Sequence, residues 1–474
     1  MSLFSEKLSK HVAQKNIKVY QISRLSGIER TSLQKMLTGA RKPSSKAQIL
    51  LLAQALSLTN EETEELLDLY SILEMGEENW TRRHNVMRLI QSFRIEENPL
   101  VSEIPSSNFS FPENQDMVIC STPFQVSQTL HSILLQESFI PSGLIQIQAQ
   151  PSFSSLINCL TTIDFNQIPI EHYICLNSEP TAKPDDLEII CGITPLLLNC
   201  PTYFSYGYYH HIDSLFSPAA FLPNLILTSQ YMMAISSDYS SALISRSPNL
   251  MELCQKHFSL QKQSSWPIFQ PTNSFEEYLT IMLLGQSPDH SYCIMDHPCI
   301  LSFLTPEILQ RILNHSAVSP DVMMQISSQI SLVQDPPVKN DTYFSLSGLQ
   351  KFMQSGRFTE VPAQYYSPLN PSEIRYLLDT ICQAAKAGYY RMHLIRSSYF
   401  EIPPHLCIGA LSPQHVTIIF NHPQKGFSTF DVKNLSLSDS IYDFMEYLQK
   451  NDDLSFSPEE SVSIVEGILR QSEI

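Results

Sequence analysis

Residues 19–43 read VYQISRLSGIERTSLQKMLTGARKP, and this stretch decides the fold expected for the N-terminal part of the chain. It predicts two short helices joined by a tight turn at Gly27. Glycine is favoured at such a turn because it adopts positive φ without strain. A basic loop follows the second helix and ends at Pro43. This arrangement is typical of a unit that lays one helix in the major groove of DNA.

Apolar spacing extends the prediction to both sides of this stretch. Side chains that recur every three or four residues form one face of a helix. The inward positions expected on this basis are Phe4, Leu8 and Val12 in a first helix, Ile22 and Leu25 in a second, Leu33, Met36 and Leu37 in a third, and Ile49, Leu52, Ala53 and Leu56 in a fourth. The acidic segment NEETEELLDLYSIL at 60–73 adds a fifth helix, so residues 1–72 are predicted to form an all-α bundle of five helices.

The charge of the chain is distributed unevenly. Residues 1–45 contain two acidic residues, Glu6 and Glu29, and nine basic ones: Lys7, Lys10, Lys15, Lys18, Arg24, Arg30, Lys35, Arg41 and Lys42. This segment has a net charge of +7, whereas the whole chain has −17, so residues 46–474 carry −24. Only the N-terminal end is therefore suited to phosphate contacts.

Residues 4–70 resemble the phage-repressor/Cro-type helix-turn-helix family, also called the XRE family. The residues that carry the resemblance are the turn Leu25-Ser26-Gly27-Ile28, the spacing from it to Leu33 and Met36, and the loop TGARKP at 38–43. The match covers about 15% of the chain. The chain departs from the family at Val19, where glutamine is frequent, and at Leu37, where glutamate is frequent.

The resemblance implies a DNA-binding surface on the third helix and the segments beside it. The positions implied to read base edges are Arg30, Thr31, Gln34 and Lys35. Those implied to contact phosphates are Lys18, Gln21, Ser32, Arg41 and Lys42. Arginine can donate two hydrogen bonds to guanine, and a threonine methyl can touch the thymine methyl. One such module covers only a half-site, so double-stranded DNA and a homodimer are the expected partners.

The bulk composition indicates a globular protein of several domains. A chain of 474 residues with 43% hydrophobic residues suggests two to four packed domains. No run of 18 apolar residues occurs, and the first 20 residues lack the apolar core of a signal peptide, so a cytoplasmic protein without a membrane span is expected. The ten cysteines form no C-x-x-C pair and are expected to be reduced core residues.

The remainder is predicted to be a mixed α/β (α+β) body behind a helical linker. The linker is placed at 73–115, an α/β sensor domain at 116–285 and a helix-rich α+β domain at 286–474. Strands expected in the first of these domains are 117–122, 144–150, 172–177, 187–193, 224–236 and 241–245, with helices at 124–138 and 247–261. The second is expected to have helices at 305–314, 319–330, 346–356, 370–388, 438–450 and 457–471, with strands at 405–411, 415–421 and 427–434.

The order of segments across 224–258 resembles phospholipase-D-like sensor domains of some regulators. The H-x-K-x-x-x-x-D motif is missing, so the resemblance implies a non-catalytic domain. Only 13 residues are glycine, and the chain lacks G-x-G-x-x-G, G-x-x-x-x-G-K-[ST], G-x-S-x-G and H-E-x-x-H. We therefore expect no catalytic residues, no cofactor and no enzymatic activity.

Two clusters of residues could supply metal ligands, but a simpler role fits each of them better. His210 and His211 are adjacent, and neighbouring residues of a strand point to opposite faces, so a shared metal is not expected. The run DHSYCIMDHPC at 289–299 holds two histidines and two cysteines that could ligate zinc. Its spacing matches no standard finger and its apolar residues favour a core strand, so no metal site is predicted.

The sequence thus predicts a sequence-specific DNA-binding transcription regulator of bacterial type. Its C-terminal region is expected to sense a small-molecule or peptide effector or to mediate oligomerisation. Two alternatives stay open: an enzyme that uses the N-terminal domain for DNA targeting, and a scaffold whose helix-turn-helix contacts protein.

Overall fold

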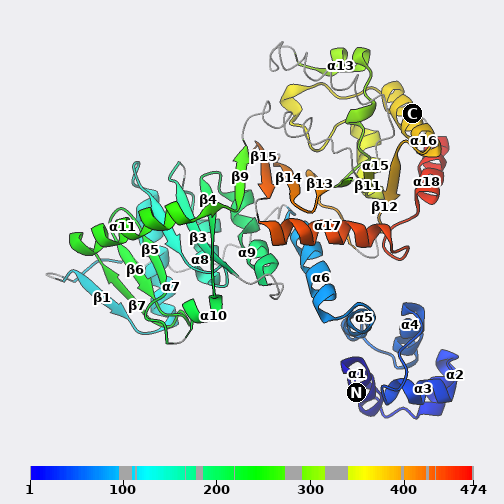
Figure 1. Cartoon of the computed structure of the whole chain (residues 1–474), viewed down its shortest axis with the longest axis horizontal. Coiled ribbons are helices and arrows are strands. Elements are labelled where there is room, and N and C mark those ends of the chain that lie inside the picture. The colour runs from blue at the N-terminus through cyan, green and yellow to red at the C-terminus, as the bar shows by residue number, and fades with distance from the viewer. Residues whose placement is uncertain are drawn as a thin grey trace. The chain divides into compact units, whose positions relative to one another are not determined.

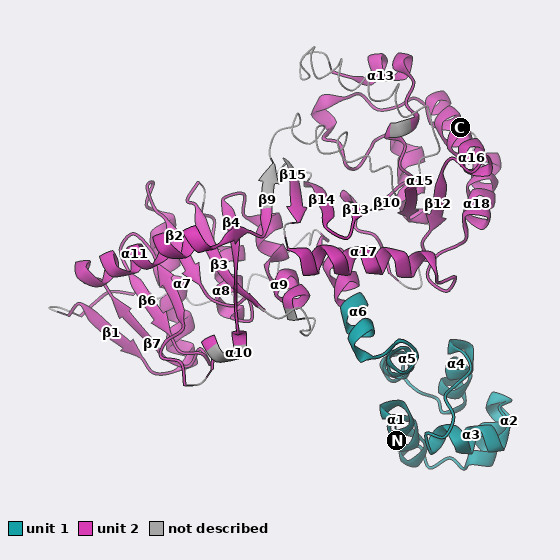
Figure 2. Ribbon diagram, in the orientation of Figure 1, with its two compact units in different colours: residues 1–84 teal, residues 85–474 magenta. Residues whose placement is uncertain are grey.

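The structure is a computed structural model (Figure 1). It describes residues 2–94, 109–112, 115–165, 167–177, 185–217, 219–272, 291–314, 340–396, 400–422, 426–432 and 434–471. The chain divides into two compact units, residues 1–84 and residues 85–474 (Figure 2). The protein is therefore multidomain, and each unit is described by itself.

The first unit is made of helices. Its helices are α1 (Leu3–Gln14), α2 (Val19–Ser26), α3 (Arg30–Leu37), α4 (Lys46–Ala55) and α5 (Asn60–Met75), followed by the start of α6 (Glu77–Ser92). Local sequence explains several helix starts, because the side chains of Ser2, Ser45 and Thr59 accept hydrogen bonds from the first-turn backbone. Gly27 ends α2 with φ 73°, as the glycine turn predicts.

The core of the first unit follows the expected apolar spacing with one exception. Phe4, Leu8, Ile22, Leu33 and Met36 are all at most 1% exposed. Leu25, expected to point inward, is 67% exposed, so that expectation is wrong.

The reason for the exposure of Leu25 lies in the geometry of α2. The buried stripe of this helix runs through Val19, Ile22 and Ser26, and Leu25 lies beside it. The buried Ser26 hydroxyl donates to the Ile22 carbonyl at 2.7 Å and accepts from the Ile28 N–H at 3.3 Å. These two bonds satisfy the hydroxyl of Ser26, which occupies a buried position where an apolar side chain would be expected.

The second unit is an α+β body with two mixed sheets. The first sheet has the order β1-β7-β6-β5-β2-β3-β4-β8, in which β2, β3 and β4 run parallel and the other pairs are antiparallel. Its strands are β1 (Met117–Cys120), β2 (Ile145–Gln148), β3 (Ile170–Asn177), β4 (Tyr203–His210), β5 (Asn224–Leu227), β6 (Met232–Ile235), β7 (Ala242–Ser245) and β8 (Trp266–Pro267). The helices of this part are α7 (Pro123–Ser138), α8 (Ser154–Thr162), α9 (Asp185–Asn199), α10 (Ile212–Leu215) and α11 (Pro248–Ser264).

The second sheet has the order β12-β11-β10-β13-β14-β15-β9. Its strands are β9 (Phe269–Thr272), β10 (Ser291–Met295), β11 (Asn340–Phe344), β12 (Arg391–Leu394), β13 (Leu406–Ser412), β14 (His415–His422) and β15 (Gly426–Val432). The helices here are α13 (Pro306–Ile312), α15 (Leu346–Ser355), α16 (Pro371–Lys386), α17 (Leu435–Gln449) and α18 (Pro458–Gln471), with short 3₁₀ turns at Leu301–Phe303 and Ala363–Tyr365. Strand β9 follows β8 directly along the chain yet pairs with β15, so the two sheets are linked at this point.

One difference from the expected elements has a physical explanation. Residues 187–193, expected as a strand, lie in helix α9. The buried residues Leu187, Ile190, Ile193 and Leu196 recur every third residue, which is a helical spacing that a short apolar run conceals. Helix α8 was not expected, and the helix expected at 319–330 lies outside the described residues.

Among the helices that the structure describes, none combines the length and the apolar character needed to cross a bilayer.

Gly348 offers a test of the packing between α15 and the end of β10. A Cβ on Gly348 would overlap the carbonyl oxygen and the carboxylate of Asp296. We expect Gly348→Ala to lower the stability of the second unit by about 3 kcal/mol, because overpacked cores must shift backbone. Calorimetric unfolding of the full chain measures this.

The matched control is Gly467→Ala in α18, where a Cβ meets nothing within 4 Å. Alanine in a helix is favoured over glycine by about 1 kcal/mol, so this variant should be slightly stabilised. Equal effects of the two substitutions would contradict the described packing.

Candidate functional site

Helix α3 has one buried and one solvent-facing side. Leu33 and Met36 are 0% and 1% exposed and face the core of the first unit. Arg30, Thr31, Gln34 and Lys35 are all exposed. The helical period places residues i, i+1, i+4 and i+5 on one face, so all four predicted base-reading residues are brought together on the solvent side of α3.

The N-terminus of α3 adds one further contact. The Thr31 hydroxyl donates a hydrogen bond of 2.5 Å to the Glu29 carboxylate. Glu29 is the residue before the helix and is exposed. The pair fixes the rotamer of Thr31, and it also places one negative charge beside the cationic face.

The residues predicted to contact phosphate differ in their surroundings. Lys18, Gln21 and Arg41 are exposed, and the Gln21 side chain accepts from the Lys18 N–H at 3.0 Å to close the start of α2. Ser32 is only 9% exposed, and its hydroxyl accepts from Arg41 Nη1 at 3.0 Å. The structure therefore gives Ser32 the role of holding Arg41 in place.

The loop after α3 is turned back onto the helix. Gly39 has φ 76°, and the Arg41 N–H donates to the Lys35 carbonyl at 3.1 Å. Together with the contact to Ser32, this bond holds Arg41 close to the C-terminal end of α3. Arg41 thus belongs to the same surface as Lys35.

The acidic helix α5 neutralises part of the basic segment. Lys42 Nζ lies 2.6 Å from a carboxylate oxygen of Glu74, and this contact raises the pKa of Lys42 above its ordinary value. Lys7 pairs with Glu65, and Lys15 with Glu62. Within the described residues, Arg24 on α2 and Arg30 and Lys35 on α3 form no ion pair, so these two helices keep their positive charge.

A second candidate site lies in the other unit, at the ends of the central strands of the second sheet. Strands β10, β11 and β12 are parallel, so their carboxyl ends meet at one edge. Asp296 and His297 follow β10 directly, and Ser345 follows β11. The Ser345 hydroxyl donates to Asp296 Oδ1 at 3.1 Å and accepts from the Gly348 N–H at 2.9 Å, which joins the two strand ends to the first turn of α15.

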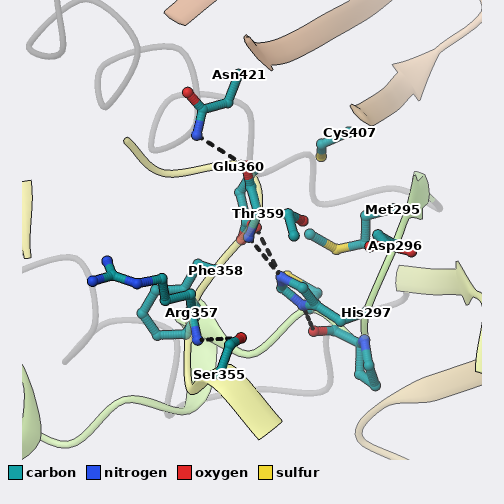
Figure 3. A network of polar contacts seen from close by, with 12 residues as sticks. Met295, Asp296, His297, Ser355, Arg357, Phe358, Thr359, Glu360, Cys407 and Asn421 are labelled. Carbon is teal, nitrogen blue, oxygen red and sulfur yellow. Dashed lines mark hydrogen bonds and ion pairs between the residues drawn. The ribbon is translucent and has the colours of Figure 1, made fainter. Parts of the chain in front are cut away.

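His297 and Glu360 form a buried pair beside these strand ends (Figure 3). Their side chains are 0% and 1% exposed. His297 Nε2 lies 3.0 Å from Glu360 Oε2 and accepts a hydrogen bond from the Thr359 N–H at 3.1 Å. The Thr359 carbonyl accepts from Asn421 Nδ2 at 3.1 Å. Among the described residues, Asp296 Oδ2 and both carboxylate oxygens of Glu360 have no hydrogen-bond partner, so the contact between Glu360 and His297 is an ion-pair contact and not a hydrogen bond.

The electrostatics favour a protonated His297. Burial acts to lower its pKa, but the Glu360 carboxylate, the Pro298 carbonyl and Asp296 outweigh burial and raise the pKa above 6.5. The second ring nitrogen, Nδ1, lies 2.9 Å from the Pro298 carbonyl oxygen. Because Nε2 accepts from the Thr359 N–H, Nδ1 is the ring nitrogen that donates in this geometry, and a second proton on Nε2 would exchange the bond to Thr359 for one to Glu360.

Neither cluster of possible metal ligands forms a metal site among the residues that the structure describes. His210 and His211 are exposed at the end of β4, with ring centroids 6.3 Å apart. Cys293 lies in β10 with its Sγ 3.7 Å from Cys407 Sγ, whereas His297 turns to Glu360. His290 lies outside the described residues.

Comparison with known proteins identifies no family for this chain. No family model matches the sequence. No curated protein matches it either.

Three solved structures show distant similarity. The polyphosphate kinase of Porphyromonas gingivalis is 9% identical with a TM-score of 0.22, and the match covers 71% of this chain and 50% of the kinase. The archaeal chromatin protein TrmBL2 is 7% identical with a TM-score of 0.23, covering 56% and 94%. The phosphatidylserine synthase of Haemophilus influenzae Rd KW20 is 9% identical with a TM-score of 0.25, covering 75% and 93%. Similarity at this level supports no argument about function.

The His297–Glu360 pair has a measurable signature in the pH dependence of stability. Because the folded pKa of His297 is raised, the pair stabilises the folded state fully below pH 6.5 and its contribution is lost as the pH rises through the folded pKa. Glu360→Gln leaves the imidazole buried without its counter-ion, so we expect a loss of about 3 kcal/mol below pH 6. We also expect the fall in stability above pH 6.5 to be absent in this variant.

Hydrogen exchange of the amides of β10 and β11, followed from pH 5 to 9 in the full chain, measures both effects. Glu466→Gln is the matched control because Glu466 forms an exposed pair with Lys386. An unchanged pH profile in Glu360→Gln would refute the buried pair.

Proposed function

We propose that the protein is a sequence-specific DNA-binding transcription regulator that reads duplex DNA with helix α3. The observation that carries the proposal is the solvent-facing side of α3. Arg30, Thr31, Gln34 and Lys35 are exposed there, while Leu33 and Met36 anchor the opposite side in the core.

The side chains on this face match the donor and acceptor groups of the major groove. Arg30 would donate two hydrogen bonds to O6 and N7 of a guanine, and the amide of Gln34 would pair with N6 and N7 of an adenine. The Thr31 methyl would contact a thymine methyl. Lys35 would add a second cation, and Arg41, which donates to the Ser32 hydroxyl at 3.0 Å, would contact a phosphate.

The finer fold assignment belongs to this proposal. Helices α1 to α5 would form a repressor-like bundle of the XRE type, in which α2 and α3 are the helix-turn-helix. A single module of this kind covers a half-site, so the regulator would act as a homodimer on a two-fold symmetric operator. The α+β body would sense an effector or mediate self-association.

The distribution of charge supports a division of labour between the two units. Residues 46–474 carry a net charge of −24 and would be repelled by the phosphate backbone. The Arg24, Arg30 and Lys35 side chains are exposed and, among the described residues, form no ion pair. DNA would therefore meet the first unit through α2 and α3.

We do not propose catalysis for the cluster at the strand ends of the second sheet. His297, Asp296 and Glu360 are each at most 1% exposed. Groups closed to solvent in this way do not meet a substrate, and the hydrogen bonds of Ser345 and Asn421 give the cluster a structural role.

Substitution of Arg30 tests base reading. Loss of a two-pronged contact to guanine costs about 1–3 kcal/mol, so we expect Arg30→Ala in the full chain to weaken binding to the preferred duplex about 10- to 100-fold and to relax the preference at one base pair. Fluorescence anisotropy with the selected sequence and its single-base variants measures both effects. Lys256→Ala, which removes an exposed cation from α11, should leave the affinity unchanged. A uniform loss over all sequences would show that Arg30 contacts phosphate only.

A substitution in the Lys42–Glu74 pair is expected to strengthen DNA binding, whereas Arg30→Ala weakens it. Glu74 competes with phosphate for Lys42, so we expect Glu74→Gln to strengthen DNA binding about two- to fivefold, the range that a surface ion pair of about 0.4–1 kcal/mol gives. The gain should be absent when Lys42→Ala is already present. A gain that persists in the double variant would contradict the competition.

A further inference from the structure

Strand β1 forms one end of the first sheet and carries an apolar surface that DNA binding leaves unused. It pairs with β7 on its inner side, and no described strand pairs with its outer side. Figure 1 shows β1 at the end of the sheet beside β7. The four residues of β1 are Met117, Val118, Ile119 and Cys120.

The two faces of β1 differ in exposure. Met117 and Ile119 project from one face and are 54% and 72% exposed. Val118 and Cys120 project from the other face, where Cys120 is 4% exposed and its Sγ lies 3.4 Å from Oγ1 of Thr129 in α7. Helix α7 thus covers one face of the edge strand and leaves the other open.

An open apolar edge of this kind is unusual in a protein that remains monomeric. Exposed edge strands are normally protected by a charged side chain, a proline or a bulge, because their unpaired backbone groups recruit further strands. Strand β1 has no charged side chain, proline or bulge within its four residues, and its short length is the one such protection that it has. Both its backbone edge and its exposed side chains are available for pairing.

We propose that β1 pairs antiparallel with β1 of a second copy of this chain and joins the two first sheets into one. In this arrangement the two-fold axis passes through Val118, so Met117 lies opposite Ile119 of the second copy and Ile119 opposite Met117. Residues opposite each other in an antiparallel pair project from the same face. Two methionines and two isoleucines therefore cover one another on the open face.

The strand is complementary to itself in shape and charge. An isologous interface uses the same patch on both copies, and a strand whose side chains are all apolar meets no charge of its own kind. The nearest carboxylate, Asp116, is neutralised by Arg246 with Oδ1 and Nε 3.0 Å apart. Two acidic bodies can therefore meet at β1 where most other surfaces would repel.

The choice of a second copy as the occupant rests on the proposed function. A module that reads a half-site needs a two-fold partner, and β1 supplies a two-fold contact outside the DNA-binding unit. Self-association through β1 and DNA binding are expected to respond to salt in opposite directions. Salt screens the repulsion between two acidic bodies and should strengthen self-association, whereas salt weakens DNA binding.

The test is the oligomeric state of the full chain by sedimentation equilibrium. We expect a dimer for the natural sequence and at least a 50-fold weaker association for Ile119→Lys, since each copy places one lysine, and the dimer two, at the paired edge. Phe221→Lys is the matched control, because Phe221 is 88% exposed in a loop of the same unit, and it should remain dimeric. Circular dichroism checks that each variant is folded.

Val118→Cys gives an independent readout that does not depend on loss of association. Its two copies lie on the proposed axis, so mild oxidation with copper phenanthroline should yield a disulfide-linked dimer, and Phe221→Cys should not. A monomeric natural chain, an Ile119→Lys variant that stays dimeric, or equal cross-linking at both positions would each overturn the proposal.

DNA binding separates this inference from the proposed function. A monomeric Ile119→Lys that still binds a half-site duplex supports both. A natural chain that dimerises through β1 but binds no duplex refutes the regulator and leaves the interface standing.

Discussion

The burial of Leu33 and Met36 behind a glycine turn is the constraint on which the proposed function depends. Gly27 ends α2 at φ 73°, a conformation that costs other residues about 1–2 kcal/mol. The turn sets the direction of α3, and the two buried side chains set its rotation about its own axis. Once that rotation is fixed, Arg30 and Lys35 have only the solvent side available. The exposed polar face of α3 thus results from core packing.

The second unit is organised around a different constraint, the satisfaction of polar groups at the ends of buried strands. Ser345 links Asp296 to the first turn of α15, and the absence of a side chain at Gly348 allows this close approach. Glu360 lies 3.0 Å from the buried His297 and raises its pKa, in a place where an unpaired ion would be costly. In the same unit, Met117 and Ile119 of the edge strand β1 are exposed. The second unit thus combines a buried core with a sheet edge that no described strand pairs with.

Local chemistry made much of this structure predictable from the sequence. The helices around Phe4 and Leu33, the turn at Gly27 and strands β1 to β3, β5 to β7 and β13 to β15 lie where spacing, caps and glycine predict them, whereas β4, β11 and β12 were not predicted. Predictions were wrong where the apolar residues fit more than one structure. Leu187 and Ile190 were expected in a strand but lie in helix α9, and Leu25 was expected in the core but is exposed. Contacts between distant segments were not predictable at all. Glu360 lies 63 positions after His297, and Lys42 meets Glu74 only through the packing of α5.

The most direct test of the central claim is selection of duplexes from a random library by the full chain, followed by affinity measurements from 50 to 300 mM salt. The account predicts an enriched motif with two-fold symmetry and an affinity that falls steeply with salt, since several phosphate contacts release counterions. An unenriched library, together with an affinity that does not change with salt, would contradict it.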